Sequence, residues 1–285
     1  MRNFIIRALT GIAYVAILVA CTVFSPVTAF FFFACVAAAC VGEFCLLVNR
    51  HAGASVVVPL NVLAAFLLAA SVWLYCIGSP STGRSLALYV LLVIYLLVSE
   101  LYRASENPLL NWALSLFSHV YAAVPFALLP MLSVRYDAFA SSYAYTWQYP
   151  LSLFVFLWAN DTGAYLFGVS LQRYFPAKLF PRISPRKSWV GSIGGGLLTL
   201  ALSVVAWRLF PDTLPLWQWL GFALVVVVFG TWGDLVESLL KRHFDIKDSG
   251  HVLPGHGGML DRFDSALLAI PAVVVYFLLI QSFLA

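Results

Sequence analysis

The fold of this chain is decided by the stretch LWQWLGFALVVVVFGTWGDLVESLLKR, residues 216–242. Its first 18 residues, 216–233, contain no charged side chain. A helix rises about 1.5 Å per residue, so such a run covers ~27 Å. The hydrocarbon core of a bilayer is ~30 Å thick. The stretch therefore predicts a transmembrane helix that brings Asp234 close to one membrane surface.

The composition of the whole chain agrees with a lipid environment. Of its 285 residues, 62% are hydrophobic and 10% are charged, whereas charged residues make up about 25% of ordinary soluble domains. The mean hydropathy is +0.94. So little charge excludes an ordinary soluble protein, and we expect no nucleic-acid partner.

Eight further apolar runs resemble the first. The nine runs cover residues 8–24, 27–48, 55–77, 86–103, 110–130, 150–171, 189–210, 216–240 and 264–284. We expect an all-α polytopic membrane protein with about nine transmembrane helices. Along the sequence it divides into N-terminal helices at 1–104, middle helices at 105–171, and C-terminal helices with cytoplasmic catalytic loops at 172–285.

Carboxylates gather where the eighth and ninth runs meet the same predicted surface. Asp234 and Glu237 are three residues apart and share a helix face, as do Asp261 and Asp264. We expect the two acidic pairs to converge at the inner interface, where carboxylates make hard oxygen ligands for Mg²⁺. The alternative is that Asp261 caps a helix and Asp234 pairs with Lys241.

The loop between these acids is rich in cations and glycine, both of which suit phosphate. Cationic side chains offset the charge of phosphate, and glycines let backbone N–H groups approach an anion closely. The cations are Lys241, Arg242, Lys247, His256 and Arg262, and the glycines are Gly255, Gly257 and Gly258. Together with the carboxylates they indicate a metal-bound triphosphate rather than a proton relay.

Two more segments carry polar residues at predicted helices. Asn160 and Asp161 lie inside the sixth run, where an ionisable residue suggests function, although a hydrogen bond between helices is the alternative. Arg186, Lys187 and Ser188 precede the seventh run, at a helix N-terminus that favours an anion. Their alternative role is anchoring by positive charge. The glycines at 194–196 are expected to let helices pack closely.

A family resemblance follows from these motifs. Residues 238–264 read Ser238-x-x-Lys241-Arg242-x4-Lys247-Asp248-x-Gly250, then Pro254-x-His256-Gly257-Gly258-x-x-Asp261-Arg262-x-Asp264. This pattern closely resembles the signature of the phosphatidate cytidylyltransferases, and the segments 158–165 and 184–192 also resemble family segments. The resemblance implies that CTP and phosphatidic acid give CDP-diacylglycerol and pyrophosphate. It also implies Mg²⁺ dependence, a companion K⁺ and a homodimer.

The expected chemistry is mainly electrostatic. A phosphate monoester has a second pKa near 6, so phosphatidic acid is already a nucleophile at neutral pH. Metal ions reduce the electrostatic repulsion between phosphatidic acid and CTP, which are both anions. We predict Asp234 and Asp261 as metal ligands, with Asp264 and Lys241 also catalytic. The predicted substrate-binding residues are Asn160, Asp161, Arg186, Lys187, Ser188, Glu237, Ser238, Arg242, Lys247, His256, Gly257, Gly258 and Arg262.

Two other functions stay open on the sequence. One is a related lipid enzyme, either a CTP-using synthase of archaeal lipids or a polyprenol kinase. The other is a transporter of anionic solutes or lipids, whose polar residues would line a path through both membrane halves. Here the polar residues concentrate on one side, which favours an enzyme.

The basic residues predict the orientation in the membrane. With the N-terminus in the cytoplasm, 13 of the 16 Lys and Arg residues lie at cytoplasmic ends, and only Arg84, Arg135 and Arg208 lie outside. We therefore expect a multi-pass protein of the inner (plasma) membrane, with a cytoplasmic N-terminus and active site.

This topology predicts that a tag placed after Ala285 faces the exterior of the cell. An impermeant reagent applied to intact cells should label such a tag, while a tag in the predicted cytoplasmic loop at 241–263 should react only after the membrane is opened. Labelling of the C-terminal tag solely from the cytoplasmic side would contradict the nine-span arrangement.

Overall fold

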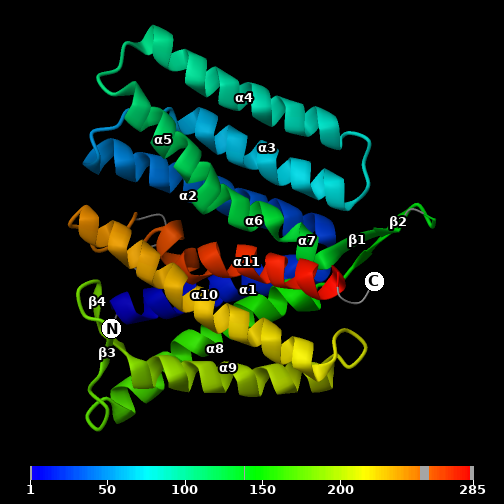
Figure 1. Cartoon of the computed structure of the whole chain (residues 1–285), viewed down its shortest axis with the longest axis vertical. Coiled ribbons are helices and arrows are strands. Elements are labelled where there is room, and N and C mark those ends of the chain that lie inside the picture. The colour runs from blue at the N-terminus through cyan, green and yellow to red at the C-terminus, as the bar shows by residue number, and fades with distance from the viewer. Residues whose placement is uncertain (1, 138, 251–256, 283–285) are drawn as a thin grey trace. The chain divides into compact units, whose positions relative to one another are not determined.

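The computed structural model describes residues 2–137, 139–250 and 257–282. It forms two compact units. Unit 1 comprises Met1–Trp147 and Ile246–Phe263, and unit 2 comprises Gln148–Asp245 and Asp264–Ala285. Figure 1 labels the α-helices and strands of both units. The predicted division of the sequence at residues 104 and 171 stays a prediction.

Unit 1 is built mainly of apolar helices. Its elements are α1 (Arg2–Phe24), α2 (Pro26–His51), α3 (Val58–Cys76), α4 (Thr82–Arg103), α5 (Pro108–Ser118), η1 (His119–Ala123), α6 (Val124–Leu128), α7 (Pro130–Ser133), β1 (Val134–Asp137) and β2 (Ser142–Tyr145). Ser25 separates α1 from α2 because its side chain and that of Thr28 form a capping box ahead of Pro26. Pro125 and Pro130 lie at the starts of α6 and α7, where the helix is interrupted.

Unit 2 contains the remaining helices and a hairpin. Its elements are α8 (Gln148–Leu171), β3 (Lys178–Phe180), β4 (Ser184–Ser188), α9 (Trp189–Leu209), α10 (Leu216–His243) and most of α11 (Met259–Ser282). Aromatic rings of α8, α10 and α11 form its core, since Phe222 contacts Phe156, Trp219 and Phe277 with ring centroids 5.3–5.8 Å apart.

The predicted fold class is confirmed. Within the described residues, seven helices are long and apolar enough to cross a membrane, and Leu9–Phe24 is a shorter apolar helix. A helix occupies every predicted apolar run. The run at 150–171 is helical but is not among the seven, because Asn160, Asp161 and Thr162 dilute its apolar character. The chain is thus a multi-pass membrane protein.

Two antiparallel hairpins were not predicted from the sequence. Strands β1 and β2 pair between α7 and α8, and β3 pairs with β4 where a plain cytoplasmic loop was expected at 172–188. The register of the second hairpin joins Lys178 to Ser188 and Phe180 to Ser184. Each strand has three to five residues, which is too short for a clear alternation of apolar and polar side chains.

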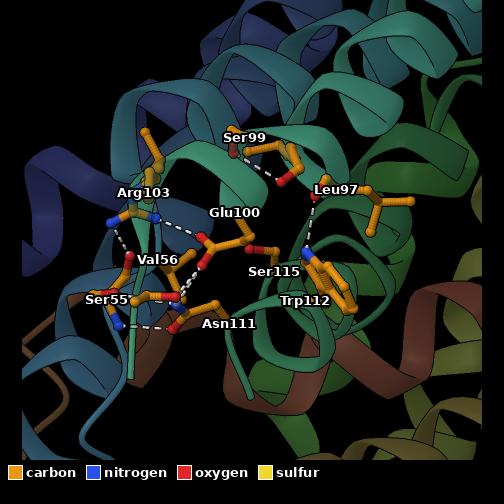
Figure 2. Close-up of polar contacts among 12 residues, drawn as sticks. Ser55, Val56, Leu97, Ser99, Glu100, Arg103, Asn111, Trp112 and Ser115 are labelled. Carbon is orange, nitrogen blue, oxygen red and sulfur yellow. Dashed lines mark hydrogen bonds and ion pairs between the residues drawn. The ribbon is translucent and has the colours of Figure 1, made fainter. Parts of the chain in front are cut away.

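A buried polar network fastens the end of α4 to α5 and to the chain before α3 (Figure 2). Glu100 accepts hydrogen bonds from Arg103 at 2.5 Å and from Asn111 at 3.0 Å, and also from Ser105. Arg103 and Asn111 in turn bind the backbone of Ser55, at 2.6 and 2.8 Å. Each oxygen of this buried carboxylate therefore has a hydrogen-bond partner, as a buried charge requires.

Helices α8 and α9 approach each other closely at glycines. A Cβ atom added to Gly195 would lie 2.4 Å from the backbone oxygen of Asn160, and one added to Gly163 would lie 2.8 Å from the Cα of Gly195. One added to Gly191 would lie 2.7 Å from the backbone oxygen of Ala164. These separations leave no room for a side chain, so the predicted packing role of the glycines is confirmed at Gly195.

The contact predicts that Gly195→Ala separates α8 from α9. The new methyl group meets backbone rather than a flexible side chain, so we expect the free energy of unfolding to fall by about 1–3 kcal/mol. Unfolding of the purified protein in detergent measures this. Gly83→Ala is the matched control because a Cβ atom there meets nothing within 4 Å. Equal stability of the two variants would contradict the close approach.

Candidate active site

A cavity of about 250 Å³ in unit 2 brings together residues from three helices and the β3–β4 hairpin. Six of the predicted site residues line it. Its lining consists of Asn160, Asp161, Ala164, Tyr165, Arg186, Lys187, Ser188, Gly191, Ser192, Thr231 and Asp234. The two sequence segments at 158–165 and 184–192 therefore meet α10 at one place.

Helix α8 supplies an amide and a carboxylate at adjacent positions. Asn160 is buried, and its Nδ2 donates to Thr231 Oγ1 of α10 at 3.4 Å. Its Oδ1 is buried without a hydrogen-bond partner among the described residues. The bond to Thr231 confirms the alternative of a hydrogen bond between helices. Asp161, one residue on, is exposed at the cavity.

The hairpin and the start of α9 form the cationic side of the cavity. Ser188 ends β4 and is the N-cap of α9, where its Oγ accepts the N–H of Gly191 at 3.2 Å. Arg186 and Lys187 immediately precede this cap. Two cations beside a helix N-terminus form a site where an anionic group is favoured by the charges and by the helix dipole.

Asp234 faces these cations from α10. Its Oδ2 lies 2.6 Å from Lys187 Nζ, and its Oδ1 accepts a hydrogen bond from Ser238 Oγ at 3.1 Å. About a quarter of each charged side chain in the ion pair is exposed. The alternative pairing of Asp234 with Lys241 is wrong, because Lys241 forms its ion pair with Glu237, one helical turn before it.

The other predicted residues of unit 2 lie close to this centre. Asp264 Oδ1 accepts the N–H of Ser265 at 2.6 Å, and its carboxylate interacts electrostatically with Asp161, Asp234 and Lys241. Arg242 is exposed and its Nε lies 3.5 Å from the backbone oxygen of Ile183. The structure therefore brings three predicted aspartates of unit 2 into one electrostatic neighbourhood.

Asp261 belongs to unit 1, where it connects Ser249 with the start of α11. Its Oδ2 accepts hydrogen bonds from Ser249 N at 2.8 Å, from Ser249 Oγ at 3.0 Å and from Gly258 N at 2.7 Å. Gly257 has φ +82°, a conformation that glycine adopts without strain. The capping alternative for Asp261 is thus confirmed, and its role as a metal ligand stays a prediction.

Several predicted residues are not gathered in the described sites. Lys247 and Arg262 are exposed, and His256 lies outside the described residues. Asp234 belongs to unit 2 and Asp261 to unit 1, so the convergence of the two acidic pairs stays a prediction.

Sequence reasoning missed Glu43, the only charged residue between positions 26 and 49. It is buried in α2, and its Oε2 accepts the N–H of Leu260 at 2.7 Å. The signal was available, because an ionisable residue within an apolar span is a functional candidate by default.

The donor set limits how a metal ion can bind. Within the described residues there is no group of three or more His, Cys, Asp or Glu side chains that could hold a metal ion. Mg²⁺ is commonly held by one or two carboxylates together with substrate phosphates and water. Asp161 and Asp234, which line one cavity, fit this mode of binding and do not form a complete protein cage.

Comparison with known proteins identifies the family. The model of the cytidylyltransferase family matches residues 5–280. The chain belongs to the cytidylyltransferase family. Among its relatives, the phosphatidate cytidylyltransferase of Staphylococcus aureus (strain COL) is 46% identical over 135 residues, which are 47% of this chain and 50% of the relative.

Other staphylococcal members of the family give similar alignments. The phosphatidate cytidylyltransferases of Staphylococcus haemolyticus (strain JCSC1435) and Staphylococcus saprophyticus are 42% and 40% identical over 156 residues. These alignments cover 53% of this chain and 58% of each relative. The chain thus matches about half the length of these curated relatives.

Proposed function

We propose that the protein transfers a cytidylyl group from CTP to phosphatidic acid, which gives CDP-diacylglycerol and pyrophosphate. The observation that carries this proposal is the cavity of unit 2, where Asp161 and Asp234 face Arg186, Lys187 and the N-terminus of α9. Membership in the cytidylyltransferase family and the names of the staphylococcal relatives support CTP and this lipid as substrates.

The reaction forms one bond and breaks one bond at phosphorus. An oxygen of the phosphatidate headgroup attacks the α-phosphorus of CTP, and the bond from that phosphorus to the bridging oxygen of pyrophosphate breaks. Both substrates are anions, so the main barrier is electrostatic repulsion. In our proposal Arg186, Lys187 and the N–H groups at the start of α9 bind phosphate oxygens and offset their charge.

The size of the cavity suits part of a nucleotide. Pockets for whole ligands commonly measure about 300–1,000 Å³, whereas this cavity measures about 250 Å³. We therefore assign it to the phosphate chain. The ion pair of Lys187 with Asp234 places a cation and a carboxylate side by side. In our proposal Lys187 binds a phosphate oxygen, and Asp234 binds the cation that accompanies the phosphate.

Mg²⁺ is proposed as the cofactor, with Asp161 and Asp234 as the carboxylates that meet it on the nucleotide phosphates. When bound, the metal ion neutralises developing charge on pyrophosphate. Asp261 as a second ligand, the companion K⁺, the homodimer, and the plasma membrane with a cytoplasmic catalytic face are further parts of the proposal.

The proposal predicts a strong preference for CTP or dCTP over ATP. Purified protein in mixed micelles of detergent and phosphatidic acid should release pyrophosphate with CTP, and replacing phosphatidic acid with diacylglycerol should stop the release. Phosphorylation of a lipid by ATP would instead assign the protein to the lipid kinases, and transport of a solute without nucleotide turnover would assign it to the transporters.

Asp234→Asn should lower turnover by about 100-fold or more while the fold is kept. Asn retains the size and the hydrogen bond from Ser238 but loses the charge that meets a phosphate-bound cation. Stability should change little, because a partly exposed ion pair contributes about 0–1 kcal/mol. Pyrophosphate release and unfolding in detergent measure the two effects.

Asp212→Asn is the matched control for this variant. Asp212 is an exposed aspartate of the same unit, in the turn between α9 and α10. It should keep wild-type turnover. Near-normal turnover of Asp234→Asn, with an unchanged Mg²⁺ requirement, would remove Asp234 from the proposed site.

A further inference from the structure

Glu43 is a buried carboxylate that the proposed reaction does not use. It lies in the middle of α2 and is 7% exposed. An ionisable side chain inside an apolar helix is costly unless it is well partnered. Within the described residues it accepts hydrogen bonds from Ser249 and Leu260 of the same unit, which lie far away in the sequence.

We infer that Glu43 is a positioning residue that ties Ser249 to the start of α11 and thereby fixes the place of Asp261. Glu43 Oε2 accepts the N–H of Leu260 at 2.7 Å and the hydroxyl of Ser249 at 3.2 Å. Leu260 lies in the first turn of α11, where backbone N–H groups have no partner within the helix. The carboxylate of Glu43, 217 residues away in the sequence, therefore accepts a backbone N–H that the helix itself leaves without a partner.

Ser249 connects Glu43 with Asp261. Its hydroxyl lies within hydrogen-bond distance of Glu43 Oε2 and of Asp261 Oδ2, and its backbone N–H donates to Asp261 Oδ2. A hydroxyl group has one proton, so it donates to one of the two carboxylates at a time. Loss of Glu43 would leave the N–H of Leu260 unpaired and would change the hydrogen bond that Ser249 makes to Asp261.

Two glycines of the signature leave space for this carboxylate. A Cβ atom added to Gly250 would lie 2.0 Å from Glu43 Oε1, and one added to Gly258 would lie 2.3 Å from the same oxygen. Both ends of the loop therefore close around Glu43 through backbone alone. This contact gives a physical reason for glycine at these two positions of the motif.

Glu43 acts through Asp261 and the loop, and in this inference it touches no reacting atom. Misplacing a reacting or binding group by about 1 Å costs about 100-fold in rate. The catalytic part of the inference rests on the proposed function, because it needs Asp261 to serve cytidylyl transfer. The structural part, the order of the loop ends, can be measured without any substrate.

The test compares Glu43→Gln with Glu43→Leu in the full-length protein in detergent. Gln keeps an oxygen that can accept from Leu260 and Ser249, whereas Leu keeps the size and accepts nothing. Hydrogen exchange followed by mass spectrometry reports the peptide 257–262. We expect Leu to speed exchange of this peptide by about tenfold or more and Gln by less than about threefold, because exchange reports local opening.

Turnover supplies the second measurement. Leu should lower kcat by about 10- to 100-fold, the range seen when residues that orient a reacting group are removed. It should leave the KM for CTP within about threefold, whereas Gln should keep most of the activity. Glu100→Gln and Glu100→Leu are matched controls, because Glu100 is another buried glutamate of unit 1 whose partners lie in a separate network. They should leave exchange of the peptide 257–262 unchanged.

Each outcome decides the inference. Unchanged hydrogen exchange and unchanged kcat in Glu43→Leu would overturn the inference. It would also be overturned if Glu43→Gln lowered kcat as much as Glu43→Leu while exchange stayed undisturbed, because the charge of Glu43 would then be required. If Glu43→Leu fails to fold, Gly258→Ala takes its place, since its methyl group displaces the carboxylate from Leu260 and should speed exchange of the same peptide. Wild-type protein without pyrophosphate release would refute the proposed function, while the exchange results would still test the positioning role.

Discussion

The architecture depends on one constraint, that polar groups within apolar helices must find partners inside the protein because hydrocarbon offers none. Glu100 meets this constraint with Arg103, Asn111 and Ser105. Glu43 meets it in part, because its Oε2 accepts the N–H of Leu260 at the start of α11, whereas its Oε1 is buried without a hydrogen-bond partner among the described residues. In both cases a carboxylate accepts hydrogen bonds from another segment of the chain. These hydrogen bonds offset part of the cost of burying the carboxylate, and they hold the two segments together.

The same constraint shapes the cavity of unit 2. Asn160 donates a hydrogen bond to Thr231 of α10, and Lys187 forms an ion pair with Asp234, so these polar side chains have partners inside the protein. Glycines at 191 and 195 let α9 come close enough to bring its N-terminus to these groups. Tight helix packing and the chemistry of the site are therefore two results of one arrangement.

Much of the fold could be predicted because hydropathy is a local signal. Length and apolarity located the helices, and the charged residues of the signature pointed to the C-terminal half. Glu43 escaped notice because its partners, Leu260 and Ser249, are more than 200 residues away. The ion pair of Lys187 with Asp234 was missed because the two residues are 47 positions apart and belong to different elements. Lys241 shares its helix with Asp234 and Glu237, and the alternative considered for it named Asp234, whereas the structure pairs it with Glu237.

The second hairpin also constrains which changes of length the chain tolerates. Strand β4 runs directly into α9 through Ser188, and its register with β3 joins Ser188 to Lys178. The register of this hairpin is irregular, because two positions of β3 (178 to 180) oppose four positions of β4 (184 to 188). Inserting one residue between 184 and 188 would change the spacing between the pairing of Ser184 and the helix cap at Ser188, and so would move Lys187 relative to α9. An insertion at 181–183, in the turn, leaves the strand and the helix cap as they are. Homologous chains should therefore vary in length at the tip of this hairpin and keep a fixed number of residues from Ser184 to the first turn of α9.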